Sequence, residues 1–218
     1  GNVELATTLN VSLDKVAPTV NAGTDKTVNA SSAQDATISD VTSGVASITW
    51  AKISGPGIVT FDAATSEDTN ISADTDGTYV IGVTVVDNAG NSNSDNITFI
   101  WDTTAPSVNA GTDSITSAQI NQNATASDAT SGIASYLWTK QTGAGIITFG
   151  TPAVEDTTIS ANADDTYVIR LTVTDLAGNQ AFDEISFTWD TTTTTTTAVE
   201  VSPSFFEQGD NVKVSALI

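Results

Sequence analysis

The chain has 218 residues, of which 39% are hydrophobic and only 15% are charged, a composition typical of a folded protein of one or two domains. Its 26 acidic residues outnumber 6 basic ones and give a formal net charge of −20, so neither nucleic acids nor anionic membrane surfaces are expected partners. The absence of Cys and His excludes disulfides, zinc–thiolate sites and a Ser-His-Asp triad, and no apolar run approaches the roughly 20 residues of a membrane-inserted helix.

The first predicted element, residues 1–15, is the last strand of a preceding or partner module. Residues 1–14 read like the later segment 90–102 with one extra residue. A lone strand is barely stable in water and leaves an edge unpaired. Either the chain is part of a longer repeat protein, or this strand completes a sandwich in a neighbouring copy by strand addition.

A long internal repeat follows this segment. Residues 17–104 align with residues 105–192 without a gap, and 50 of the 88 positions are identical. A unit of about 90 residues is too long for a solenoid turn and has the size of one β-sandwich. We therefore predict two modules, module 1 at residues 16–103 and module 2 at residues 104–190.

Each module contains strands with a period of two residues. In the segment 167–175, Tyr167, Ile169, Leu171 and Val173 share one face, and polar residues occupy the other. The same alternation recurs at the equivalent positions of module 1 and in the last strand of both modules. Gly- and Asn-rich turns separate these short strands and no helical period is present, so the sequence predicts an all-β fold of tandem antiparallel β-sandwiches.

One Trp in each module marks a further strand. Ala46, Ile48 and Trp50 alternate in module 1, and Trp138 occupies the position equivalent to Trp50. An exposed Trp could stack on a sugar, but a Trp on a central strand packs into the core. We predict the second arrangement for both residues.

These segments resemble a known domain type. The runs Asn-Ala-Gly-Thr-Asp (109–113), Ile-Ala-Ser-Tyr-Leu-Trp-Thr-Lys (133–140) and Thr-Tyr-Val-Ile-Arg-Leu-Thr-Val-Thr-Asp (166–175) resemble the PKD-type immunoglobulin-like domain. The joint Asp-Thr-Thr-Ala-Pro (102–106) and the hairpin Asp-x-Ala-Gly-Asn are similar to those of tandem immunoglobulin-like repeats in bacterial and archaeal surface proteins. The resemblance implies an extracellular stalk, adhesin, coat or fibre, and it names no ligand.

In such a sandwich the entering linker lies beside the loop between the second and third strands and beside the last hairpin. This placement would gather oxygen ligands suited to Ca²⁺ at one end of each module. The alternative is that these residues only cap local turns. The predicted ligand sets are Asp14, Asp40, Asp87 and Asn91 in module 1 and Asp102, Asp128, Asp175 and Asn179 in module 2.

Other acidic residues are predicted to lie in solvated loops. These include the pairs Glu67-Asp68 and Glu155-Asp156, and the cluster that contains Asp74 and Asp76. Two carboxylates can serve a glycosidase, but these acids recur in two copies of a small module with no evident cleft. We therefore expect no catalysis.

The chain ends with two further predicted segments. Seven Thr residues at 191–197 form an extended or O-glycosylated linker, and residues 198–218 are opening strands of a further module or a donor segment. If both ends exchange strands, copies would join head to tail as a fibre. Asn-x-Ser/Thr sequons become glycan sites only in a host with the machinery; they begin at Asn10, Asn29, Asn70, Asn96 and Asn123.

Two functions remain open at this point. The first is a non-catalytic structural segment of an extracellular, cell-surface stalk or filament, whose partners are copies of itself or adjacent modules. The second is a carbohydrate- or protein-binding module of an adhesin or secreted enzyme. Two similar copies favour a spacer, whereas a binding module is expected to differ from its neighbour and to expose an aromatic patch.

Overall fold

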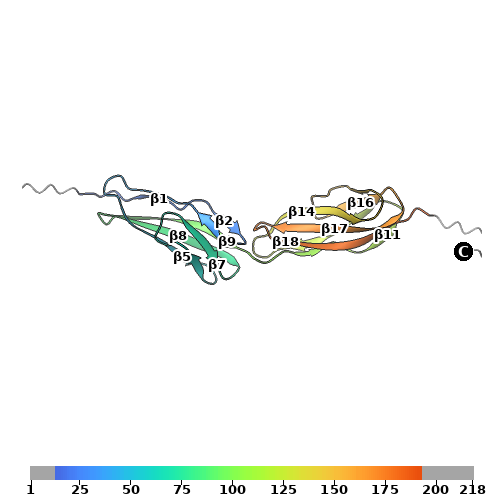
Figure 1. The fold of residues 1–218 in the computed structure, drawn as a ribbon, viewed down its shortest axis with the longest axis horizontal. Helices are drawn as coiled ribbons and strands as arrows, with labels where there is room; N and C mark the ends of the chain where they lie inside the picture. Colours follow the sequence, from blue (N-terminus) through green and yellow to red (C-terminus); the bar gives the residue numbers. More distant parts are fainter. Residues whose placement is uncertain (1–12, 193–218) are drawn as a thin grey trace, which may run out of the picture.

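Alternating apolar residues give each module its long strands, and turn residues separate them into two layers. The computed structural model describes residues 13–192, which form two β-sandwich modules placed end to end along the long axis (Figure 1). The strands of module 1 are β1 (Thr19–Asn21), β2 (Lys26–Val28), β3 (Ser32–Gln34), β4 (Thr37–Ser39), β5 (Val45–Ser54), β6 (Val59–Phe61), β7 (Thr69–Ala73), β8 (Gly77–Asp87) and β9 (Ser92–Trp101). Those of module 2 are β10 (Ser107–Asn109), β11 (Ser114–Thr116), β12 (Ile120–Gln122), β13 (Thr125–Ser127), β14 (Ile133–Thr142), β15 (Ile147–Phe149), β16 (Thr157–Ala161), β17 (Asp165–Asp175) and β18 (Gln180–Trp189).

The two modules share one topology. In module 1 a four-stranded sheet, ordered β2-β9-β8-β5, faces a three-stranded sheet ordered β3-β7-β6, and β1 pairs with β4. Module 2 repeats this arrangement with β11-β18-β17-β14, β12-β16-β15 and β10-β13. The prediction of an all-β fold of tandem sandwiches is therefore confirmed.

The core of each module lies between its two sheets, and most of its buried side chains come from the inner face of the four-stranded sheet. Tyr167, Ile169, Leu171 and Val173 on β17 have no exposed surface, and their equivalents on β8 are buried in the same way. Both core Trp residues are buried too, with exposed fractions of 3% for Trp50 and 2% for Trp138. The core prediction for these two residues is confirmed, so they are unavailable for sugar stacking.

Two details differ from the sequence prediction. The strand that carries the core Trp is an edge strand, because β5 and β14 each pair with only one neighbour in the four-stranded sheet. Its alternation also breaks near Ala46, which is exposed because the pairing register with β8 shifts between Val45 and Ser47.

The sandwiches are also not wholly antiparallel. The short strands β2 and β11 pair in parallel with β9 and β18, the last strands of their modules. Thus one strand near the start of each module is hydrogen-bonded to the strand by which the chain leaves it.

The predicted terminal segments lie outside the described residues. They are the strand at residues 1–15, the Thr linker at 191–197 and the opening strands at 198–218. Only the last three residues of the first segment and the first two of the Thr linker are described. Within residues 13–192 there is no helix long and apolar enough to cross a membrane.

Candidate metal centres at the module ends

Three aspartates from three separate segments meet at the same end of each module. In module 1 they are Asp14 before β1, Asp40 after β4 and Asp87, the last residue of β8. In module 2 they are Asp102 after β9, Asp128 after β13 and Asp175, the last residue of β17. One carboxylate oxygen from each residue lies within 4.8 Å of the other two in both clusters. The structure thus brings all six predicted Asp residues together as two triads.

Backbone hydrogen bonds explain why these segments converge. The amide of Leu176 in the β17–β18 hairpin donates to the carbonyl of Gly132 at 2.9 Å, which fixes the hairpin against the loop that carries Asp128. The side chain of Asn179 then holds the entering linker, because its Nδ2 donates to the carbonyls of Asp102 (2.8 Å) and Thr104 (3.3 Å). Module 1 repeats both arrangements.

The predicted ligands Asn91 and Asn179 lie beside the triads. Each donates its Nδ2 to a carboxylate oxygen of its hairpin Asp, Asn91 to Asp87 at 2.7 Å and Asn179 to Asp175 at 2.8 Å. Each therefore ties a triad residue to the linker. Metal ligation by these two residues stays a prediction.

Turn capping occupies only one carboxylate oxygen of each loop Asp. Oδ1 of Asp128 accepts the amides of Thr130, Ser131 and Gly132 at 2.8–3.1 Å, as expected for a capping residue. Its Oδ2 has no hydrogen bond within the described residues, and the same holds for Asp40. The turn-capping alternative is therefore right for one oxygen of each loop Asp, while the other oxygen remains available to a cation.

The triad of module 1 contains a buried oxygen without a donor. Asp14 is only 9% exposed, and its Oδ2 has no hydrogen-bond partner among the described residues. Two carboxylates less than 5 Å apart repel each other by roughly 3 kcal/mol at an effective dielectric constant of about 20. A buried carboxylate oxygen without a donor adds a desolvation cost. Both costs are relieved by a divalent cation with oxygen ligands, so the buried Asp triads could hold metal ions.

Hydrogen bonds keep two triad members acidic. Burial raises the pKa of Asp87, but hydrogen bonds from Asn91 and from the turn amides outweigh burial and lower it below its ordinary value. For Asp128, burial is likewise outweighed by the amides of Gly132, Ser131 and Thr130, so its pKa is also lowered. Both groups are therefore ionised at neutral pH, the state in which a carboxylate binds a cation.

A pH dependence of stability follows from these shifts. A carboxylate whose pKa is lowered in the folded state stabilises the fold fully above its unfolded pKa, which is about 3.9 for Asp. This contribution is lost as the pH falls through the lower, folded pKa. We expect the melting temperature in the presence of chelator to be constant from neutral pH to about pH 5 and to fall below pH 4. Circular dichroism measures this melting temperature. In the Asp128→Asn variant, the fall in the melting temperature of module 2 at acid pH should be smaller than in the unmodified chain. An equal fall in both would show that other groups cause the acid sensitivity.

The two triads differ in one contact. In module 2, Oδ2 of Asp102 accepts the hydroxyl of Ser131 at 2.5 Å and its amide at 3.2 Å. In both modules the Ser hydroxyl also lies 3.4 Å from Oδ1 of the loop Asp, but Ser43 has no bond to Asp14, so Oδ2 of Asp14 is left without a donor among the described residues.

Most of the loop acids are exposed, as predicted, but Asp76 and Glu155 are half-buried, and several of these acids have structural roles. Glu67 and Asp68 accept the amides of Ile38 and Ala36, so they tie the loop before β7 to the segment around β4. Asp76 accepts the amide and hydroxyl of Thr103, both at 2.9 Å, and the hydroxyl of Thr104 at 2.6 Å. The role of Asp76 in holding the linker was missed from the sequence. The available signal was its recurrence as Asp164, whereas Asp74 is replaced by Asn162.

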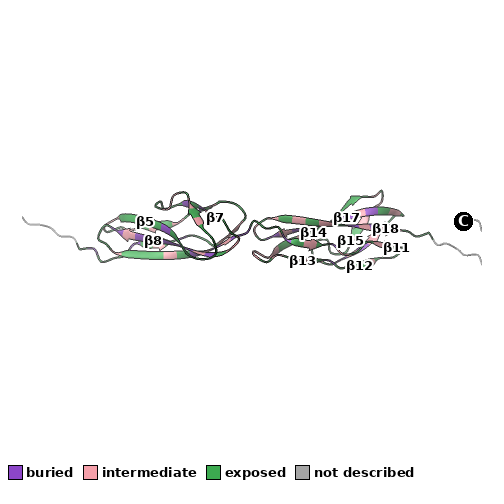
Figure 2. Cartoon of the chain, turned by 90° about the horizontal axis from the view of Figure 1, so that it is seen from below, coloured by how far each residue is buried: buried purple, intermediate pink, exposed green. Residues whose placement is uncertain are grey.

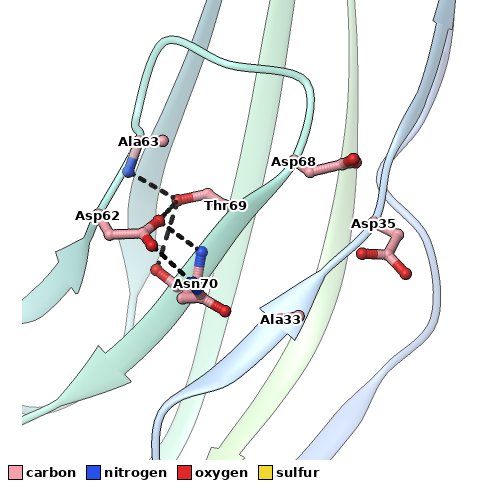
Figure 3. A pocket seen from close by; sticks show the side chains of 7 residues that line it. All are labelled: Ala33, Asp35, Asp62, Ala63, Asp68, Thr69 and Asn70. Atoms are coloured by element: carbon pink, nitrogen blue, oxygen red, sulfur yellow. Dashed lines mark hydrogen bonds between the residues drawn. The ribbon is translucent and has the colours of Figure 1, made fainter.

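Module 1 contains a shallow acidic pocket. It has a volume of about 200 Å³ and is lined by Asp35, Asp62 and Asp68 with small and polar neighbours (Figure 3). Asp62 is already engaged by Asn70, whose amide and Nδ2 donate to it at 2.7 and 2.6 Å. Module 2 has Asn123 and Gly150 where module 1 has Asp35 and Asp62. Two of the three acids that line this pocket are therefore not repeated, whereas Asp68 recurs as Asp156.

Comparison with known proteins matches each module to a domain family. The family described as "K319L-like, PKD domain" matches residues 22–100 and again residues 110–189. A comparison with curated protein sequences gave no significant match.

Solved structures with similar folds include single and tandem modules. The PKD domain of the KIAA 1837 protein is 24% identical, with 44% of this chain and 92% of that one covered and a TM-score of 0.34. The fibronectin(III)-like modules of Clostridium thermocellum CbhA are 13% identical, with 79% and 94% covered and a TM-score of 0.38. The human desmocollin-1 ectodomain is 11% identical, with 80% and 36% covered and a TM-score of 0.34.

Proposed function

Because the chain belongs to the K319L-like PKD domain family, we propose that it is a non-catalytic structural segment of an extracellular, cell-surface stalk or filament. The observation that carries this proposal is the repetition of one linker arrangement. Thr103 is held by Asp76 where the chain leaves module 1, and Thr191 is held by Asp164 where it leaves module 2. Adjacent modules of a longer chain, or copies of it, are the proposed partners. PKD and other immunoglobulin-like modules are typical of extracellular proteins.

Surface labelling tests the location. An antibody against residues 13–192 is expected to label intact cells of the source organism without permeabilisation. Labelling that requires lysis would contradict an extracellular stalk. An antibody against a cytoplasmic protein of the same cells serves as the control for leakage.

We further propose Ca²⁺ as the ion of the two triads. Their ligands are hard carboxylate oxygens, and neither a thiolate nor an imidazole is present in the sequence. The buried, donorless Oδ2 of Asp14 is the atom that most needs a cation. Extracellular modules bind Ca²⁺ with dissociation constants of about 10⁻⁴–10⁻³ M.

Calcium is then expected to raise the melting temperature. At about 10 mM Ca²⁺ the free ion exceeds these dissociation constants by roughly 10- to 100-fold, which stabilises the folded state by about 1.4–2.7 kcal/mol per site. Calorimetric scans with Ca²⁺ and with chelator measure the shift. Asp40→Asn should lose it in module 1 and Asp128→Asn in module 2. Unchanged scans of the unmodified chain would leave turn capping as the sole role of the triads.

A second candidate, a binding module, is favoured by one surface of module 2. Leu137 and Phe182 are 51% and 57% exposed and both lie opposite Thr172 in the sheet, while the Arg170 guanidinium stacks 3.9 Å from the Phe182 ring. Module 1 has Thr49 and Ser94 at the equivalent positions. A glycan array compares Phe182→Ser with the unmodified chain: binding lost in the variant would support this candidate, and no binding by either would remove its carbohydrate form.

A further inference from the structure

The linker between the modules is very short and is bonded to both of them. Residues 102–106 connect β9 to β10, and Figure 2 shows where the two modules meet. The first three residues of this linker make the contacts with both modules: Asp102 is buried, and Thr103 and Thr104 are exposed. On the module 1 side, the amide of Asp102 donates to the carbonyl of Val28 at 3.0 Å, and Asp76 accepts three hydrogen bonds from the two Thr residues. The linker is therefore fixed to module 1 by its backbone and by one carboxylate.

On the module 2 side, the same linker forms part of the metal centre. Asp102 is a member of the triad and has no exposed surface. Its carbonyl and that of Thr104 accept Nδ2 of Asn179, and Asn179 is bonded in turn to the triad residue Asp175. A displacement of Asp102 would consequently disturb the attachment of the linker to module 2.

One hydrogen bond crosses directly between the modules. Nδ2 of Asn29 in module 1 donates to Oδ1 of Asn179 in module 2 at 3.0 Å. Asn29 follows β2 immediately, and β2 is paired with β9, the strand that leads into the linker. Asn179 therefore contacts the triad, the linker and the neighbouring module with one side chain.

We propose that the triad of module 2 and the joint form one unit, in which the bound cation fixes the orientation of module 2 relative to module 1. The proposal rests on the proposed binding of Ca²⁺. With the ion present, Asp102 is drawn to Asp128 and Asp175, and Asn179 keeps its contacts with the linker and with Asn29. Without the ion, the hydrogen bonds from Ser131 to Asp102 still hold the linker, but repulsion among the three carboxylates acts against them and loosens the contacts of the joint.

The chain provides an internal control for this effect. The triad of module 1 has the same three Asp residues, but none of them lies in the linker between the two modules. An ion at Asp14, Asp40 and Asp87 can stabilise module 1 without setting the orientation of module 2. Asp40→Asn is therefore the matched control for Asp128→Asn.

The test measures the distance between the modules in the presence and absence of Ca²⁺. The chain has no native Cys, so spin labels can be attached to Thr60→Cys and Thr148→Cys, two equivalent exposed positions on β6 and β15. Double electron–electron resonance then gives the distribution of label distances. We expect about 10 mM Ca²⁺ to narrow this distribution relative to chelator. Mg²⁺ at equal ionic strength controls for charge screening.

Three variants distinguish an effect of the ion on the joint from ion binding alone. The narrowing should persist in Asp40→Asn and be lost in Asp128→Asn. Asp76→Asn leaves every triad residue in place, so it should still bind Ca²⁺ by isothermal titration calorimetry while its distance distribution stays broader than that of the unmodified chain. Circular dichroism confirms that each variant is folded.

Two results would overturn the inference, and they differ in what they imply for the proposed function. If calorimetry detects two Ca²⁺ sites but the distance distribution is the same with ion and chelator, the coupling to the joint is wrong and Ca²⁺ binding stands. If calorimetry detects no binding, the cation proposal fails as well, whereas the proposal of a surface stalk is still decided by cell labelling.

Discussion

Replacement of Trp138 by alanine is expected to lower the free energy of unfolding of module 2 by about 3–5 kcal/mol. The indole is 2% exposed and lies near Phe149, with a centroid separation of 6.5 Å. Its Nε1 donates to the carbonyls of Val154 and Glu155 at 3.2 and 3.1 Å, and both hydrogen bonds are lost in the variant. Because a domain of this size is stable by only about 5–15 kcal/mol, this one change can remove much of the stability of module 2.

Denaturant titration with a separate transition for each module measures the effect. Trp50→Ala is the matched change and should destabilise module 1 instead. Trp138→Phe keeps an aromatic ring but loses the two hydrogen bonds, so its cost should be smaller than that of Trp138→Ala. A loss below about 1 kcal/mol for Trp138→Ala, the size of an ordinary surface change, would contradict the core role.

Two glycines with the same backbone conformation are expected to differ strongly in their tolerance of alanine. Gly23 has φ of 90° and Gly90 has φ of 89°, both in the left-handed region. A Cβ at Gly23 would lie 2.4 Å from the carbonyl oxygen of Asp35 and 2.5 Å from Nε2 of Gln34, whereas nothing lies within 4 Å of a Cβ at Gly90. Gly90→Ala should therefore cost only the backbone strain, about 1–2 kcal/mol.

Gly23→Ala should cost this strain and about 1–3 kcal/mol more from overpacking. The clash also opposes the hydrogen bond by which buried Gln34 holds the carbonyl of Ala22 at 2.5 Å. Urea unfolding of the two variants compares the costs directly. Equal destabilisation by both changes would show that the close approach at Gly23 relaxes freely. Gly111 and Gly178 offer the same comparison in module 2, with φ of 95° and 96°.

The sandwich fold and the triads were predictable because they depend on periodicity and repetition. The alternation of apolar and polar residues in a strand such as 167–175 predicts which side chains are buried. The topology of an immunoglobulin-like sandwich then places Asp102, Asp128 and Asp175 at one end of the module. Alternation does not tell an edge strand from a central one, since both bury one face. The edge position of β14 follows instead from strand order, which the period does not contain.

The contacts of the joint were not predictable for a different reason. Asp76 and Asn29 act on residues of the linker or of the next module, so their roles depend on how two folded bodies meet. Neither residue belongs to an apolar pattern, and both look like ordinary turn residues. The parallel strands β2 and β11 were not predicted, because three residues are too few to show the two-residue alternation of a strand.

The position of the joint residues within the repeat bears on how such a chain can evolve. Each 88-residue unit has an Asp, Asp76 or Asp164, that is hydrogen-bonded to the linker after the unit. Each unit also has an Asn, Asn91 or Asn179, that is hydrogen-bonded to the linker before it. A gene duplication that copies one whole unit therefore copies both halves of a joint in phase. Recombination between equivalent points of two units can thus lengthen or shorten the protein while these linker contacts are kept. The direct hydrogen bond between Asn29 and Asn179 is not copied in this way, because module 2 has Ser117 in place of Asn29.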